Sequence, residues 1–204
     1  MSGTTTVARK RTAGKTLLET TGKETAGEYE APRLAVPVTP ERDHIEGAVK
    51  AALTLVEYGD YQCPYCGAAY PEVKKVQKKL GSELRFVFRN FPLTNIHEYA
   101  MNAAETAEAA SAQGKFWPMH DFLYEHQPTL SNTSVALGYA RTLGLDGQKF
   151  EREIAQHLYQ KRIKDDFMGG LRSGVNGTPT FYVNGIRHDE DAVARALIEG
   201  LKQT

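Results

Sequence analysis

The cysteine pair most restricts how this chain can fold, because it lies where a strand pattern gives way to a helix pattern. The chain has only two cysteines, Cys63 and Cys66. The apolar run at 52–58 contains β-branched residues and neither glycine nor proline, which predicts a buried strand. Beyond the pair, apolar residues recur every three or four positions up to Leu80, and Gly81 is a typical helix stop. We therefore expect both cysteines at the start of a helix that follows a buried strand.

A second strand pattern follows this helix. Residues 84–91 are rich in Phe, Leu and Val, and two strands joined by a helix are expected to be parallel. The stretch 92–174 carries no strand pattern and predicts helices at 96–112, 116–124, 134–143 and, as one long helix, from Asp146 onward. This predicted helix contains two sets of apolar residues, and within each set neighbouring members are four positions apart. The sets are Phe150, Ile154 and Leu158, and Ile163, Phe167 and Leu171.

Strand character returns near the carboxyl end. Residues 180–183 and 186–188 predict two strands, and the Asn184–Gly185 dipeptide between them favours a two-residue hairpin. Asp189 is a suitable cap for a final helix. One face of that helix carries Val193, Leu197 and Leu201. The predicted order is β-α-β, then helices, then β-β-α, which is an α/β fold with an all-helical insertion.

The predicted elements divide the chain into three parts. Residues 1–40 predict a disordered tail with an extended lead-in, 41–91 together with 175–204 form an α/β domain, and 92–174 form a helical insertion domain. No apolar segment of an export signal follows the basic residues Arg9, Lys10 and Arg11. We therefore expect a cytoplasmic protein, or an extracytoplasmic one if the true start lies upstream.

Composition excludes several kinds of partner. Lys and Arg number 25, as do Asp and Glu, so the net charge is zero and the electrostatic signature of a nucleic-acid binder is missing. The apolar runs are only a few residues long, which argues against a membrane span. A chain of 204 residues can bury a core without disulfide staples, so the cysteines need another explanation. The oligomeric state is left open, with a monomer favoured.

Three chemistries compete for the cysteine pair. A structural disulfide across so small a loop would remove little entropy from the unfolded chain. Zinc would need two further ligands, and the sequence has no second CxxC and no His pair at finger spacing. Dithiol redox chemistry needs only the two residues present, and we favour it.

The position of each cysteine suggests its role. Pro64 suits the first position of a helix, so Cys63 lies beside unpaired backbone N–H groups at the positive end of the helix dipole. Such a position lowers the pKa of a thiol and favours the reactive thiolate. Cys66 lies one turn further on the same face and points inward, where it stays protonated. We expect Cys63 to be the nucleophile and Cys66 the resolving cysteine.

Two segments of the sequence resemble a known family. Residues 57–66, which read EYGDYQCPYC, and residues 177–181, which read GTPTF, are similar to thioredoxin-fold proteins of the DsbA type. The resemblance runs from about Arg42 to the carboxyl end. It implies a thioredoxin-like fold with a helical domain inserted between its two halves, in agreement with the predicted order of elements.

The resemblance also implies roles for individual residues. Cys63 and Cys66 match the active-site pair, and Glu57 matches a buried acid that assists proton transfer at the second cysteine. Pro179 matches the family's cis-proline, and Thr178 before it offers backbone hydrogen bonds to an extended substrate peptide. From the residues alone, Pro179 could instead be a trans proline at a strand start and Glu57 a solvated carboxylate, both as minority alternatives.

The two residues between the cysteines depart from the family's strong oxidants. The pair Pro64–Tyr65 stands where those members have Pro-His, and Pro-Tyr occurs in many glutaredoxins. Because tyrosine lacks the partial positive charge of histidine, we expect Tyr65 to leave Cys63 less acidic and the couple more reducing.

These observations predict a thiol-disulfide oxidoreductase that acts on protein or peptide thiols and disulfides. It would need a redox partner to recycle it and no bound cofactor, with glutathione as an alternative co-substrate. One rival is a glutathione-dependent transferase or isomerase of the kappa-class type, although that group keeps a serine or lacks the second cysteine. The other rival is a redox or zinc sensor without turnover.

Other residues with chemical potential are assigned to packing or to the surface. The six histidines are scattered, and His120 with Asp121 lies in an amphipathic helical pattern rather than in a recognisable site. Phe116, Trp117 and Tyr124 are expected in the core of the insertion. A group of four lysines is expected on the exposed face of the helix that begins at the cysteines: Lys74, Lys75, Lys78 and Lys79.

Overall fold

The computed structural model describes residues 1, 31–189, 193, 195–197 and 200. The chain divides into two units, Met1–Glu30 and Ala31–Thr204, and the fold concerns the second. Residues 2–30 of the predicted tail and lead-in, and the predicted helix residue Leu201, lie outside the described residues. The expected boundary between an α/β domain and a helical insertion domain stays a prediction.

A five-stranded sheet forms the base of the structure, with strand order β1-β3-β2-β4-β5. Its strands are β1 (His44–Gly47), β2 (Leu53–Gly59), β3 (Leu84–Asn90), β4 (Thr180–Val183) and β5 (Ile186–His188). Only β2 and β3 are parallel, as their helical connection predicts. The other pairs are antiparallel, including β2 with β4. The predicted α/β fold with returning strands is confirmed.

Strand β1 was not expected from the sequence. It pairs antiparallel with the edge of β3, with Ile45 opposite Val87. Its sequence, His-Ile-Glu-Gly, offers one apolar residue and no alternation long enough to register as a strand. Pairing with β3, rather than its own residue pattern, makes this segment a strand.

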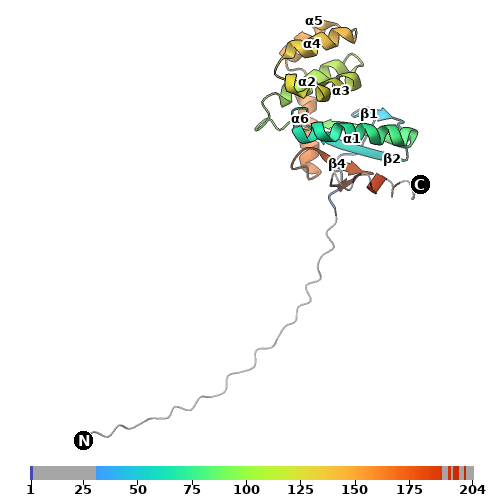
Figure 1. Cartoon of the computed structure of the whole chain (residues 1–204), viewed down its shortest axis with the longest axis vertical. Coiled ribbons are helices and arrows are strands. Elements are labelled where there is room, and N and C mark those ends of the chain that lie inside the picture. Colours follow the sequence, from blue (N-terminus) through green and yellow to red (C-terminus); the bar gives the residue numbers. More distant parts are fainter. Residues whose placement is uncertain (2–30, 190–192, 194, 198–199, 201–204) are drawn as a thin grey trace. The chain divides into compact units, whose positions relative to one another are not determined.

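Helix α1 (Pro64–Leu80) covers one face of the sheet and ends at Gly81, as the apolar periodicity predicts (Figure 1). The alternation of β2 divides its side chains between the two faces. Leu53 and Leu55 pack on the α1 side, whereas Val56 and Tyr58 pack on the other side. Because side chains alternate along a strand, Glu57 lies on the same face as Leu53 and Leu55 and therefore faces α1.

The stretch 92–174 is helical throughout its regular structure, with no strand among these residues. Its helices are α2 (Ala100–Ser111), α3 (Phe116–Glu125), α4 (Thr133–Thr142), α5 (Gly147–Ala155) and α6 (Gln160–Arg172), with short 3-10 turn η2 (Gln127–Thr129) after α3. In Figure 1, α4 and α5 lie farthest from the sheet, and α2 and α3 lie between them and α1. The insertion therefore reaches α1 mainly through α3.

The single long helix predicted from Asp146 onward is wrong. Residues 156–159 form turns that separate α5 from α6, and His157 adopts a left-handed conformation with φ of 54°. The break lets α5 pack on α2 and α4 while α6 packs on β3. Leu158, predicted in the apolar stripe, lies in these turns and is 54% exposed, and Leu171, near the end of α6, is 46% exposed.

The carboxyl-terminal elements follow the prediction where they are described. Asn184 and Gly185 have φ of 48° and 83°, the conformation that a two-residue hairpin of this type requires. Residues 193, 195–197 and 200 are helical, and Val193 and Leu197 are buried in the core on the α1 side of the sheet. No helix in the described part of the chain is both long and apolar enough to cross a membrane.

Candidate active site

The two cysteines lie at the junction of the loop after β2 and the start of α1. Cys63 is the N-cap residue, with extended backbone, and Pro64 occupies the first turn. Both thiols are free, and both side chains are buried, Cys66 completely. The predicted placement of the pair at the start of a helix is therefore confirmed.

The surroundings of Cys63 favour its thiolate. They lower its pKa to about 5, chiefly through a hydrogen bond from Cys66, with smaller contributions from Thr178 and from the backbone of Cys66 and Tyr65. Burial acts in the opposite direction and is outweighed. The backbone contribution is the helix N-terminal effect expected from the sequence, but the neighbouring thiol has the larger influence.

The surroundings of Cys66 have the reverse effect. Burial raises its pKa well above the ordinary value, and hydrogen bonding to Cys63 and the negative charge of Glu57 raise it further. Its Sγ atom accepts a hydrogen bond of 3.5 Å from the Asp60 N–H. One sulfur is therefore held as a thiolate at neutral pH and the other as a thiol.

Glu57 is buried beneath α1. It is 2% exposed, and its charge raises the pKa of Cys66 and of the buried hydroxyls of Tyr61 and Tyr124. The interpretation of Glu57 as a solvated carboxylate at a strand end is therefore wrong. The charge of Glu57 acts on the Cys66 thiol, and the expected assistance to proton transfer at Cys66 stays a prediction.

Thr178 and Pro179 lie on the opposite side of Cys63. Sγ of Cys63 lies 3.3 Å from the Thr178 carbonyl oxygen, to which it donates a hydrogen bond when it is protonated, and the peptide bond between Thr178 and Pro179 is cis. The antiparallel register sets Thr180 opposite Tyr58 near the end of β2. This pairing carries the 178–179 segment to the end of the sheet where α1 begins.

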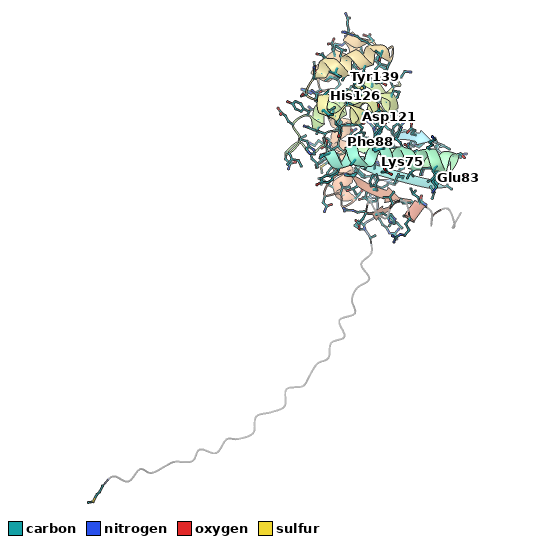
Figure 2. The ribbon with its side chains drawn as sticks, in the orientation of Figure 1. Lys75, Glu83, Phe88, Asp121, His126 and Tyr139 are labelled. Atoms are coloured by element: carbon teal, nitrogen blue, oxygen red, sulfur yellow. The ribbon has the colours of Figure 1, made fainter. Side chains whose placement is uncertain are left out.

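Within the CPYC sequence, Pro64 and Tyr65 are both exposed, and Tyr65 has 71% of its surface exposed. The lysines of α1 are also largely exposed, except Lys74, which is half-buried. Lys74 pairs with Asp121 of α3 at 3.0 Å. Asp121 lies where the insertion meets α1 (Figure 2).

Asp60 is a further site residue, to which the sequence alone assigns no role. Its carboxylate accepts hydrogen bonds from the N–H groups of Gln62 and Leu93, both at 2.8 Å, and from Nδ1 of His97 at 2.7 Å. Its side chain has no exposed surface. No residue pattern near Asp60 indicates that His97, 37 positions further along the chain, contacts it.

Gln127 was also missed. Its Nε2 atom donates to the carbonyl oxygens of Tyr61 at 2.7 Å and Cys63 at 3.0 Å. A glutamine just after a predicted helix gives no signal of such a contact in the sequence.

His120 and its aromatic neighbours pack as expected. His120 is buried, its Nδ1 lies 3.1 Å from the Tyr61 hydroxyl, and burial lowers its pKa well below the ordinary value. Phe116 and Tyr124 are buried against Phe88 of β3, and Trp117 is partly buried. No group of three or more potential metal ligands is present among the described residues.

Comparisons with known proteins agree with this architecture. The thioredoxin family model matches residues 39–202. Among solved structures, oxidised BdbD of Bacillus subtilis has a TM-score of 0.73 at 21% identity, covering 85% of this chain and 98% of that one. A thioredoxin-like oxidoreductase of Silicibacter pomeroyi has a TM-score of 0.67 at 27% identity, covering 80% and 94%. The structure of α-DsbA1 of Wolbachia pipientis has a TM-score of 0.66 at 18% identity, covering 83% of this chain and 97% of that one.

The curated relatives are named as antiporters rather than as thioredoxin-like proteins. Proteins named Na⁺/H⁺ antiporter NhaA 1 are 49% identical in Salinispora arenicola and 42% identical in a Mycobacterium species. The matches cover 76% and 83% of this chain but only 24% and 28% of those proteins. This chain thus spans about a quarter of the length of these relatives. By its family match and its fold, the chain belongs to the thioredoxin family and has the DsbA-like form of that fold, with a helical insertion.

Proposed function

We propose that the protein is a thiol-disulfide oxidoreductase that exchanges disulfides with protein or peptide thiols through Cys63 and Cys66. The observation that carries this proposal is the opposite tuning of the two neighbouring sulfurs. The pKa of Cys63 is lowered to about 5, whereas that of Cys66 is raised by burial and by Glu57. Attack by a thiolate, followed by resolution by a second thiol, needs this difference.

In the reducing direction, the Cys63 thiolate attacks one sulfur of a substrate disulfide and the other substrate sulfur leaves as a thiolate. Cys66 then gives up its proton with help from Glu57 and attacks Sγ of Cys63. The second substrate sulfur, bonded to Cys63 until then, leaves as a thiolate, and the two electrons gained by the substrate come from the Cys63–Cys66 dithiol, which becomes a disulfide. The oxidising direction is the reverse sequence.

The segment at Thr178 and Pro179 is the proposed substrate-binding edge. Its carbonyl at Thr178 already approaches Sγ of Cys63 at 3.3 Å. An extended peptide whose cysteine reacts with Cys63 could pair with this backbone as an added strand. Tyr65, exposed beside the sulfur, is proposed to leave the couple less oxidising than histidine would.

Turnover with insulin as the disulfide substrate tests the proposal. With glutathione as the reductant, the wild-type chain should reduce insulin, and both Cys63→Ser and Cys66→Ser should lose the activity. Conjugation of glutathione to a chloronitrobenzene that survives Cys66→Ser, without insulin reduction, would instead identify a transferase. Stoichiometric zinc in the purified protein, again without insulin reduction, would identify a sensor. The antiporter name belongs to much longer proteins, of which this chain matches 24% in Salinispora arenicola.

A further inference from the structure

Gln127 reaches from the helical insertion to the loop that carries the nucleophile. It lies in η2, between α3 and α4, and its single amide nitrogen bridges the carbonyl oxygens of Tyr61 and Cys63. We propose that Gln127 is a positioning residue that holds residues 61–63 so that the first N–H groups of α1 face Sγ of Cys63. This inference rests on the proposed dithiol function and adds a role for the insertion in tuning it.

The packing around the amide indicates a dedicated contact. A Cβ atom at position 67 would overlap Oε1 of Gln127, so any side chain larger than that of glycine would displace the Gln127 amide from its present position. Glycine within a helix is unfavourable compared with alanine, so its presence here fits the need for space. The Cys63 carbonyl accepts from the Gly67 N–H at 3.1 Å as well as from Gln127. This one oxygen therefore joins the helix and the insertion.

The other end of the same loop is also held by residues beyond β3. The Cys63 N–H donates to the Asp60 carbonyl at 3.1 Å, and the Asp60 carboxylate is fixed by Leu93 and His97. Gln127 is the contact on the side nearer the nucleophile. Because two hydrogen bonds depend on one side chain, its removal should loosen residues 61–63 without removing any group that touches the sulfur.

The expected consequence is electrostatic. With the loop less fixed, the backbone N–H groups of Tyr65 and Cys66 point less well at the sulfur, and the thiolate loses stabilisation. A less stable Cys63 thiolate disfavours the reduced, dithiol form of the Cys63–Cys66 pair relative to its disulfide. In equilibrium with glutathione disulfide, the Cys63 thiolate and the Cys66 thiol give up two electrons as their disulfide forms. Glutathione disulfide takes these electrons, the Cys66 proton and one proton from water, and two glutathione molecules form. Loss of the Gln127 contact should shift this equilibrium towards the Cys63–Cys66 disulfide.

The test compares three variants of the full chain. Gln127→Met keeps the size of the side chain but removes its donor. Gln113→Met is the matched control, because Gln113 also lies in the insertion and bonds backbone through both amide atoms, accepting from the Asp146 N–H at 2.9 Å and donating to the Asp146 carbonyl at 3.4 Å, away from the cysteines. Gly67→Ala retains Gln127 but displaces its amide, while alanine favours the helix.

Two readouts are measured for each variant: the pKa of Cys63 from thiolate absorbance at 240 nm, and the equilibrium constant with glutathione. We expect Gln127→Met and Gly67→Ala to raise the pKa and to shift the equilibrium towards the disulfide by about threefold to tenfold, and Gln113→Met to change neither. Thermal unfolding shows whether Gln127→Met still folds. If it does not, Gly67→Ala decides the question.

The two proposals fail in different ways. A wild-type chain without a reversible equilibrium with glutathione contradicts the proposed function and, with it, this inference. A wild-type chain with that equilibrium, combined with unchanged values in Gln127→Met and Gly67→Ala, contradicts the positioning role alone. An equal shift in Gln113→Met also contradicts it, because any loosening of the insertion would then suffice.

Discussion

Sγ of Cys63 lies 3.3 Å from the carbonyl oxygen of Thr178, although 115 positions separate the two residues in the chain. The sheet produces this contact, because β4 runs antiparallel to β2 and returns the chain to the end of the strand from which α1 starts. Proposed nucleophile and proposed peptide-binding backbone thus come from the two halves of the fold, on either side of the insertion.

The first prediction concerns the pH dependence of Cys63. Because its pKa is lowered to about 5, the rate of alkylation by iodoacetamide should rise with pH and reach half its plateau near pH 5. A half-maximum near the free-thiol value of about 8.5 would show that the site does not stabilise the thiolate.

The same shift should affect the stability of the reduced chain. The pKa of Cys63 is lower in the folded state than in the unfolded state, so its contribution is complete above the unfolded value of about 8.5 and is lost as pH falls through about 5. Urea unfolding of the reduced wild type and of Cys63→Ser should therefore show the wild type gaining relative stability between pH 5 and pH 8. A constant difference across this range would contradict the lowered pKa.

The Glu57→Gln variant should distinguish the effect of the Glu57 charge on the pKa of Cys66 from the role of Glu57 as proton acceptor for Cys66. Removing the negative charge should lower the pKa of Cys66, because Glu57 raises it. Resolution of a mixed disulfide should nevertheless slow by on the order of a hundredfold, since the proton acceptor is lost. Stopped-flow measurement of product release, with thiol titration of the same variant, checks both changes. Faster resolution in Glu57→Gln would rule out proton transfer by this residue.

Tyr65→His should make the couple more oxidising. At pH 6 a histidine at this exposed position is largely protonated, and its charge should stabilise the Cys63 thiolate. The equilibrium with glutathione should move towards the dithiol by about twofold to fivefold, the range expected for an exposed charge. Tyr65→Phe is the control and should leave the equilibrium unchanged. No difference between the two variants would deny Tyr65 a tuning role.

Asp60→Asn tests the attachment of the active-site loop to the segment after β3. An asparagine would turn an N–H₂ group or a weaker acceptor towards the donors of Leu93 and His97, so the chain should lose about 1–3 kcal/mol of stability in urea unfolding. Asp146→Asn is a matched control at an exposed helix N-cap, where asparagine serves as well as aspartate. Equal losses in the two variants would contradict a special role for Asp60.

Local patterns predicted the elements that carry the cysteines. The strand at β2, the start of α1 at Pro64 and the hairpin at Asn184–Gly185 each depend on neighbouring residues, and each is confirmed. Segments whose structure depends on distant partners were not predicted. Strand β1 exists because β3 pairs with it, and the break at His157 exists because α5 and α6 pack on different elements.

The same distinction applies to the site. The positions of Cys63 and Cys66 followed from the strand-to-helix junction, and those of Glu57, Thr178 and Pro179 followed from a family resemblance. His97 and Gln127 reach the loop from 37 and 64 or more positions away along the chain. No periodicity or motif indicates which residue so far along the chain will contact the loop, so these contacts could be found only in the folded structure.

Trapping of the mixed disulfide tests the central claim most directly. The Cys66→Ser variant, incubated with a peptide that contains a disulfide, should form a stable covalent adduct at Cys63, because no second thiol can resolve it. Mass spectrometry of the digested adduct should locate the substrate on Cys63, and the reciprocal Cys63→Ser variant should form almost none. An adduct on Cys66 in Cys63→Ser, formed as fast as the adduct on Cys63 in Cys66→Ser, would contradict the assignment of nucleophile and resolving thiol.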